Sequence, residues 1–296
     1  MKLGLSCVLV AVSVPAAAKG DDPKAAATKL VKQQVASLAA MIDETELPEH
    51  VYTDDATFSI VNDSVDVGKS GAAQLGDAVL GPCGLHSHSL KDVRAQLAAD
   101  GQTAVVSFAV HFELKCDVSG EYFDRDERAT ELAVKTKDGW RIAGGLWSQA
   151  MANGPINAAA IKGTMPALDP VADADGDAGL RAALDALLAK GVDDAAAARK
   201  ELTAIGSGPK EITTSGAAFA KPWKAAWVSK ALATGHVRAE VAPSGTTGWA
   251  VANVMLAKKK GGDSYVIPFR VLFVFDKNGD AWSLVHVTFA VPSPSS

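Results

Sequence analysis

The sequence predicts an α+β protein built from two similar domains. Helix-forming segments come first and a run of long hairpins follows, and this order occurs twice along the 296 residues. The tetrapeptide that begins at Ser70 is repeated at Ser215, 145 positions later, and Trp140 has a counterpart in Trp282 at an offset of 142. A repeat of roughly 120 residues has the size of a domain. We therefore interpret the chain as a tandem duplication, in which each copy is a curved antiparallel sheet over N-terminal helices.

The first 18 residues have the pattern of a secretory signal peptide. Lys2 supplies the positive charge, Leu3–Val14 is a largely apolar run of 12 residues, and the small residues Ala16–Ala18 offer a cleavage site. This run is too short to cross a bilayer, and no later segment is long enough either. We therefore expect an exported protein of the periplasm or extracellular space, without a membrane span.

Composition limits the class of partner and indicates the domain boundaries. The net charge is −5 and the pI is 5.7, whereas a nucleic-acid partner requires a basic surface, so we expect none. Residues 153–176 are rich in Gly, Pro, Ala and Asp and have no apolar periodicity, which predicts a linker. The two domains are then expected at residues 24–152 and 177–293.

Two cysteines, Cys83 and Cys116, follow the signal segment, and an exported protein keeps such a pair oxidised. They flank two predicted strands. If the turn between the strands centres on positions 99 and 100, paired positions add up to 199, which is also the sum of 83 and 116; a turn one position later still leaves the cysteines close. We therefore predict a disulfide. The alternative, a metal site with His86 or His88, has no usual zinc spacing, so we expect neither a metal nor a cofactor.

The elements of the first copy follow from periodicity and turn signals. Apolar residues from Leu30 to Ile42 form a helical stripe, a short strand pair is expected around Asn62, and Ser70 is a cap for a helix over 71–80. An Asp-Gly pair at 138–139 is a strong hairpin signal between the last two of four long strands. These strands are expected at 86–97, 102–116, 121–136 and 140–150.

The second copy is expected to repeat this order. Leu180–Leu188 forms the apolar stripe of a first helix, residues 193–204 are expected to form a second, and Ser215 caps a third. The strands are expected at 234–242, 247–258, 264–275 and 281–291.

Two segments of the first copy resemble a known family. They are the Ser-Gly-Ala-Ala block with its helix, and the closing hairpin Leu132–Ile142 with Trp147 after it; both have weaker versions in the second copy. The pattern resembles the SnoaL-like branch of the NTF2-like superfamily, over roughly residues 30–150 and 178–291. The resemblance implies two cone-shaped α+β domains whose mouths hold a small apolar ligand. It also implies several functions, because the superfamily contains isomerases, cyclases, dehydratases and members without chemistry.

Candidate cavity residues come from strand alternation and from the resemblance. Tyr52 and Asp54 lie where some members of the family place polar cavity groups, although adjacent aspartates also cap helices or face water. Aligning the last strands on Trp140 and Trp282 places His286 on the same face as Trp282, where it is either a general base or a hydrogen-bonded histidine of a sheet.

A further candidate is His111, which alternates with Glu113 on one face of a strand. This pair is either an acid–base dyad or part of a solvated face. We expect an exported, non-enzymatic protein that binds a small hydrophobic ligand or a protein partner. The alternative is an isomerase- or dehydratase-like enzyme that uses one of the two cones.

Overall fold

We describe the protein from a computed structural model, over residues 22–40, 51–60, 63–66, 83–116, 120–149, 161–162, 174–208, 211–260 and 263–291. The expected signal peptide at 1–18 and the expected helix at 71–80 lie outside these residues. In the described part, no helix is both long and apolar enough to cross a membrane. The architecture is α+β with two separate sheets, as predicted.

The first sheet has six strands in the order β2-β1-β6-β5-β4-β3. Neighbouring strands are antiparallel except β1 and β6, which are parallel. Helix α1 (Pro23–Ala40) packs on this sheet through Ala27, Leu30 and Val31. The four long strands begin and end within two residues of their expected positions. The strands are β1 (Tyr52–Ile60), β2 (Asp63–Asp66), β3 (Gly84–Leu97), β4 (Thr103–Lys115), β5 (Tyr122–Thr136) and β6 (Gly139–Gln149).

The second sheet repeats this order as β10-β9-β14-β13-β12-β11, with β9 and β14 parallel, and it has a second parallel pair in β8 and β11. It also includes β8 beside β11, and β7 beside β13, both from the range expected to be a linker. The strands are β7 (Ile161–Lys162), β8 (Ala174–Gly176), β9 (Thr203–Ile205), β10 (Ile212–Thr213), β11 (Trp227–Val241), β12 (Thr247–Lys260), β13 (Asp263–Asn278) and β14 (Ala281–Ala290).

Three helices accompany the second sheet: α4 (Ala178–Lys190), α5 (Val192–Ala197) and α6 (Gly216–Ala226). The prediction of a helix over 193–204 is wrong in its second half. The helix ends at Ala197, and Thr203–Ile205 forms β9 because its backbone pairs with β14 in the sheet. Long-range pairing here overrides the local helical pattern.

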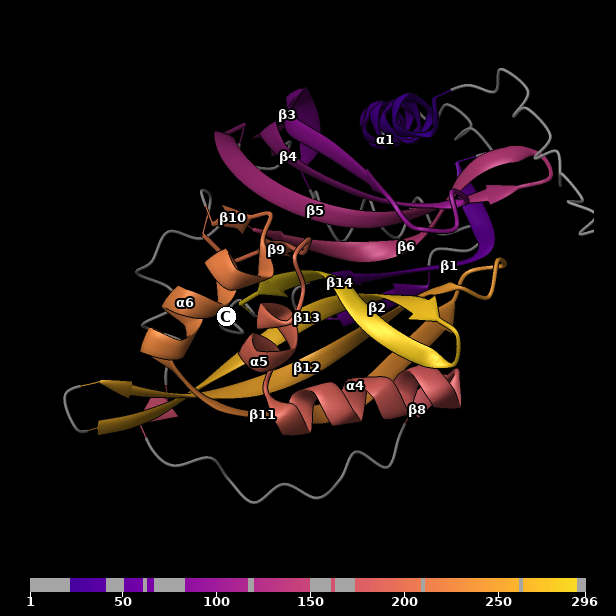
Figure 1. Cartoon of the computed structure of the whole chain (residues 1–296). Helices are drawn as coiled ribbons and strands as arrows, with labels where there is room; N and C mark the ends of the chain where they lie inside the picture. Colours follow the sequence, from indigo (N-terminus) through magenta and orange to yellow (C-terminus); the bar gives the residue numbers. More distant parts are fainter. Residues whose placement is uncertain are drawn as a thin grey trace, which may run out of the picture.

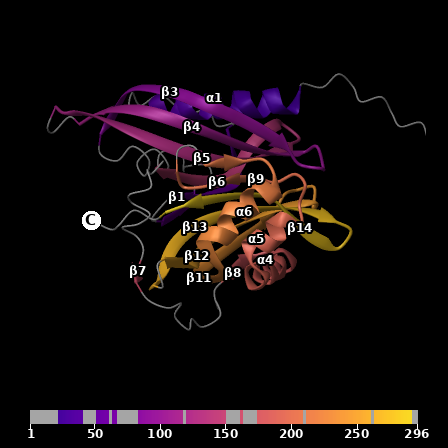
Figure 2. The same cartoon turned by 60° about the vertical axis from the view of Figure 1, so that its left-hand side comes forward.

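The two sheets are stacked with their helices outermost (Figures 1 and 2). We call the side of each sheet that packs on its own helices the inner face, and the side toward the other sheet the outer face. Each inner face has its own apolar core, and a third cluster joins the outer faces. This shared cluster includes Val105, Leu132 and Leu146 from the first half and Trp249, Leu272 and Val274 from the second. The two copies therefore form one stacked unit with separate inner cores.

Equivalent hairpin turns from the two copies meet at one end of this stack. In the first turn, the Ala98 N–H donates to the Thr103 carbonyl at 2.8 Å, and in the second the Ala242 N–H donates to Thr247 at 2.8 Å. Asp100 accepts hydrogen bonds from Thr103 within its own turn and from Ser244 in the other, the latter at 2.6 Å. Because Asp100 and Ser244 are equivalent positions, 144 residues apart, the copies are related here by an approximate two-fold arrangement.

The disulfide between Cys83 and Cys116 is present, with Cα atoms 4.3 Å apart, as predicted. Its register depends on two irregularities in β3. Near the turn, Leu97 pairs with Ala104, a sum of 201, whereas Gly84 pairs with Lys115, a sum of 199. The two extra residues in β3 therefore bring the cysteines opposite each other. The corresponding strand β11 has irregularities at corresponding places, which supports a shared origin for the two copies.

Candidate functional site

The inner face of the first sheet is apolar apart from a few side chains of β5. Its walls include Phe58 from β1 and Phe108, Val110 and Phe112 from β4, and α1 covers part of it. Glu131 pairs with Val106 and Gly145, and Glu127 pairs with Val110 and Gln149. Side chains of directly paired residues lie on the same face of a sheet. Two glutamates therefore lie on the face that forms the core of this domain.

Glu131 is fully buried and is held by Trp147. The indole Nε1 of Trp147 donates a hydrogen bond to the Glu131 carboxylate at 2.8 Å, and both side chains are 0% exposed. Gly145 provides the space for this arrangement. A Cβ atom at Gly145 would lie 2.6 Å from the Thr130 carbonyl oxygen and 3.1 Å from the Glu131 Cγ. The absence of a side chain at this position thus allows the carboxylate to lie under β6.

Glu127 is also buried, with 2% of its surface exposed, and it forms an ion pair with Arg125 two positions earlier on the same face. Burial raises the pKa of Glu127 to about 7, although the Arg125 guanidinium acts in the opposite direction. At neutral pH this carboxyl is therefore able both to donate and to accept a proton. Four positions of an extended strand separate it from Glu131, a spacing of roughly 13 Å, so the two carboxyls do not form a directly bonded dyad.

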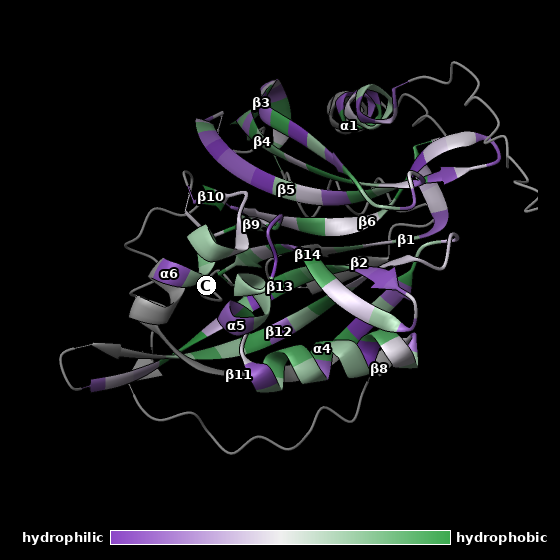
Figure 3. Ribbon diagram, in the orientation of Figure 1, coloured by the Kyte–Doolittle hydropathy of each residue, from purple (hydrophilic) through white to green (hydrophobic). Residues whose placement is uncertain are grey.

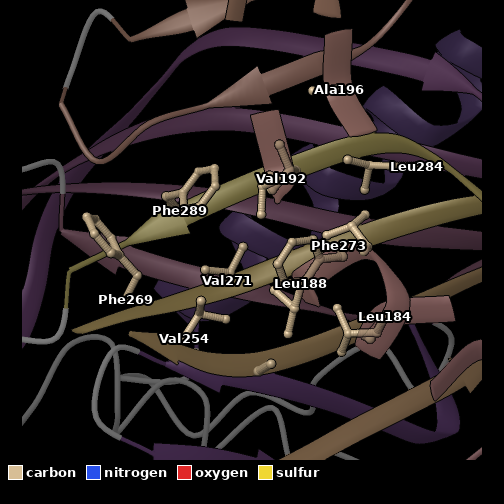
Figure 4. Close-up of a cluster of buried hydrophobic side chains, with 14 of the residues drawn as sticks. Leu184, Leu188, Val192, Ala196, Val254, Phe269, Val271, Phe273, Leu284 and Phe289 are labelled. Atoms are coloured by element: carbon tan, nitrogen blue, oxygen red, sulfur yellow. The ribbon is translucent and has the colours of Figure 1, made fainter. Parts of the chain in front are cut away.

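The second domain has no counterpart of these glutamates. A one-residue bulge lies at Ala143 in β6 and at Val285 in β14, 142 positions apart, and it defines the equivalence of the strands. By this equivalence Phe273 occupies the place of Glu131, and Phe269 that of Glu127. Figure 4 shows both phenylalanines in the apolar cluster between β13 and the helices. The two glutamate positions are therefore apolar in the second domain, where the carboxylate buried among the described residues is that of Asp193 in α5.

Of the cavity residues predicted from the sequence, Tyr52, Trp140 and Trp282 contact the inner cores, whereas the others do not. Tyr52 is half-buried and packs edge-on against Phe58, with ring centroids 5.8 Å apart, at the first core. Asp54 is exposed on β1. Trp140 and Trp282 are partly buried at equivalent places, each against the core of its own domain.

The prediction that His286 shares a face with Trp282 is wrong. The bulge at Val285 reverses the alternation, so that Leu284 joins the inner core whereas Val285 joins the cluster between the sheets. His286 lies on the outer face, where its Nε2 is 2.8 Å from the Thr288 hydroxyl. Thr288 is in turn 2.9 Å from the hydroxyl of Thr130 in the first sheet. Burial lowers the pKa of His286 to about 3, so it is neutral at physiological pH and belongs to the contact between the halves.

His111 lies on the outer face of β4, opposite to the side chains of Phe108, Val110 and Phe112, as the alternation predicts. Its Nδ1 is 2.9 Å from Asp126 of β5, and its ring is partly exposed. Glu113 is on the same face. This group is remote from the inner face, because the sheet itself separates the two.

Sequence reasoning missed Glu127 and Glu131 for a physical reason. In β5, Leu132 and Val134 alternate with the glutamates, so the pattern suggests one apolar face and one solvated face. Around Glu131 both faces are buried, because the inner core covers one and the second sheet covers the other, whereas the outer face at Asp124 and Asp126 is exposed. The signal in the sequence was the contrast with the second copy, in which Phe269 and Phe273 replace the two glutamates.

Residues 24–144 match a family model described as SnoaL-like domain. A nuclear transport factor 2 (NTF2-like) superfamily protein from Salmonella enterica is 18% identical, over 45% of this chain and 94% of that one, with a TM-score of 0.36. A hexachlorocyclohexane dehydrochlorinase from Novosphingobium barchaimii is 14% identical, over 44% of this chain and 90% of that one, with a TM-score of 0.37. A ketosteroid isomerase-like protein from Erwinia carotovora is 19% identical, over 45% of this chain and 100% of that one, with a TM-score of 0.35. No curated protein matches the chain.

Proposed function

We propose that the inner face of the first domain, in the part of the chain that matches the SnoaL-like family model (residues 24–144), binds a small, largely apolar molecule through Glu127 and Glu131. The observation that carries the proposal is the pair of buried glutamates in an otherwise apolar core. Burying a carboxyl group costs free energy, and proteins retain such groups mainly where they have a task. The second domain has phenylalanines at both positions, and its core packs without the glutamates.

The chemistry of the face defines the class of ligand. Phe58, Phe108 and Trp147 belong to this face, and Phe108 packs edge-on against Trp147 with ring centroids 5.4 Å apart, so we expect a ligand with an apolar ring or chain. The glutamates accept hydrogen bonds, so the ligand is expected to carry a hydroxyl or amine donor. We assign the second domain a supporting role, since its outer face packs against the outer face of the first sheet.

We further propose that the protein acts outside the cytoplasm. The support is the signal-like segment at residues 1–18 together with the Cys83–Cys116 disulfide, because disulfides persist in oxidising compartments.

The test is native mass spectrometry of the chain purified from its own source, followed by NMR titration with the molecule that co-elutes. We expect one small organic ligand per chain and a shift of the Trp147 indole N–H signal on rebinding. Glu131→Gln keeps an acceptor for Trp147 but replaces one carboxyl oxygen by an amide donor, and we expect it to weaken binding at least tenfold. Glu113→Gln, on the outer face of β4, is the matched control and should bind normally. An empty wild-type protein, or equal binding by both variants, would contradict the proposal.

A second function, catalysis by proton transfer, is favoured by the position of Glu127. A carboxyl with a pKa near 7 beside a guanidinium is suited to act as a general acid or base in an isomerase- or dehydratase-like reaction. The same titrations separate the two functions. If the ligand is converted, Glu127→Gln should lower turnover far more than it lowers binding; if the ligand is returned unchanged, binding is the function.

A further inference from the structure

The outer face of the first sheet carries a compact group of histidine and carboxylate side chains near the turn that joins β4 to β5. His111 of β4 pairs directly with Asp126 of β5, and the next pair on the same face is Glu113 with Asp124. Asp124 and Asp126 belong to the first half of β5, which is hydrophilic and shown in purple in Figure 3. Asp124 and Asp126 are largely exposed, and His111 is partly exposed. We call these four residues the outer-face group.

The ligand atoms of this group converge. One atom each from His111, Glu113 and Asp124 lies within 4.8 Å of the others. The Nδ1 of His111 is 2.9 Å from the Asp126 carboxylate, and its Nε2 is 3.8 Å from that of Asp124. A carboxylate on one ring nitrogen fixes the ring and its tautomer, so the other nitrogen is presented as a ligand. The Nε2 atom is therefore presented toward Asp124, and the carboxylate of Glu113, which also accepts a hydrogen bond from the Ser87 hydroxyl, lies close by.

The charges on the strand pair also favour a cation at this place. Glu113 and Asp124 are directly opposite each other, and like charges in this position destabilise a sheet. The basic residues at the neighbouring positions are engaged elsewhere. Lys115 lies over the ring of Tyr122, and Arg128 donates to the Gly206 carbonyl in the second domain at 2.7 Å. A bound cation would balance the carboxylates that these side chains do not reach.

We propose that the outer-face group binds one divalent transition-metal ion, with zinc as the representative. The His111 Nε2 and the carboxylates of Glu113 and Asp124 are the ligands, and Asp126 is the positioning residue that holds the imidazole. An imidazole among the ligands favours zinc and its neighbours over calcium and magnesium, which prefer oxygen alone. Three protein ligands leave a coordination position for water or an external group. The ligands lie on paired strands, whose spacing the sheet holds constant.

This site is independent of the ligand proposed for the inner face. The inner-face glutamates and the outer-face group project from opposite sides of β5, since Glu127 pairs with Val110 of the first core whereas Asp126 pairs with His111. Loss of one function should therefore leave the other intact.

The test is isothermal titration of the tag-free, chelator-treated full chain with zinc chloride, with magnesium and calcium chloride as separate titrants. We expect one zinc ion per chain and no comparable binding of magnesium or calcium. His111→Ala and Asp124→Asn should each weaken binding more than a hundredfold, and Asp126→Asn should weaken it 10- to 100-fold, as for other residues that orient a ligand.

The matched control is His88→Ala, which removes an exposed histidine of the neighbouring strand β3 and should bind zinc like the wild type. The thermal midpoint of each apo variant, measured in parallel, shows whether the fold is kept; Asp124→Asn changes only an exposed carboxylate and serves if His111→Ala does not fold. The proposal is overturned if the wild type binds no zinc, if it binds calcium or magnesium as well as zinc, or if Asp124→Asn binds zinc as tightly as the wild type.

Discussion

Two buried titratable side chains on opposite faces respond to pH with opposite sign. Glu127 has a pKa raised from 4.5 to about 7, so the folded state holds a proton that the unfolded chain releases; the resulting stability is present below pH 4.5 and is lost as pH rises through 7. His286 has a pKa lowered from 6.5 to about 3, so its contribution is present above pH 6.5 and is lost as pH falls toward 3. Between pH 7 and pH 5 the two effects largely cancel in the wild type.

Replacing Glu127 by Gln isolates the contribution of this carboxyl to the pH dependence of stability. Glutamine imitates the protonated carboxyl, so the variant should gain stability relative to the wild type by about 1 kcal/mol between pH 6 and pH 8. The measurement is the free energy of unfolding in urea at both pH values. Glu113→Gln, at an exposed site, should follow the wild type. A Glu127→Gln difference that is independent of pH would mean that this carboxyl is already ionised in the folded protein at pH 6.

At the scale of elements, hairpins were predictable and bulges were not. The Asp138-Gly139 turn and the alternation on either side place β5 and β6 within two residues of their observed ends. The extra residues at Ala143 and Val285 have no local signal, because a bulge depends on how the partner strand is anchored. One such residue was enough to move His286 from the expected cavity wall to the contact between the sheets. The candidate site was therefore less predictable than the strands that carry it.

The disulfide is the element-scale feature with a measurable energy. It closes a loop with a sequence separation of 33 at the open end of the β3–β4 hairpin. Replacing both Cys83 and Cys116 by serine should lower the free energy of unfolding by roughly 3 to 4 kcal/mol in the loop-entropy model. Reduction of the wild type should have a similar effect, whereas the double variant should be insensitive to reductant. A loss below about 1 kcal/mol would indicate that the two bulges of β3 hold the register by themselves.

At the scale of the whole molecule, buried hydrogen bonds connect the two domains. The hydroxyls of Thr130 and Thr288, both nearly or fully buried, are 2.9 Å apart across the apolar cluster that joins the sheets. Buried polar groups must be paired, so this contact favours one docking position of the two sheets over others. Gln96 of β3 adds a second link, since it accepts a hydrogen bond from the Thr203 hydroxyl at 2.8 Å.

A double-mutant cycle measures this link in solution. Thr130→Val and Thr288→Val should each destabilise the protein by about 1 to 3 kcal/mol, because each leaves a buried hydroxyl without its partner across the sheets. The double variant should be less destabilised than the sum, with a coupling of at least about 0.5 kcal/mol. Thr136→Val, whose hydroxyl bonds to Gly139 within one hairpin, should be additive with Thr288→Val. Additivity of the first pair would mean that the sheets do not meet at these threonines.

The meeting of equivalent turns at Asp100 and Ser244 has a consequence for how this protein was able to change. In a homodimer, every mutation alters both subunits, so a carboxyl introduced into one interior is introduced into the other as well. Here both copies are encoded in one gene, so each can mutate independently while the two remain in the same chain. The second copy was thus free to take phenylalanine at positions 269 and 273 while the first kept glutamate at 127 and 131, an asymmetry that two identical chains cannot have.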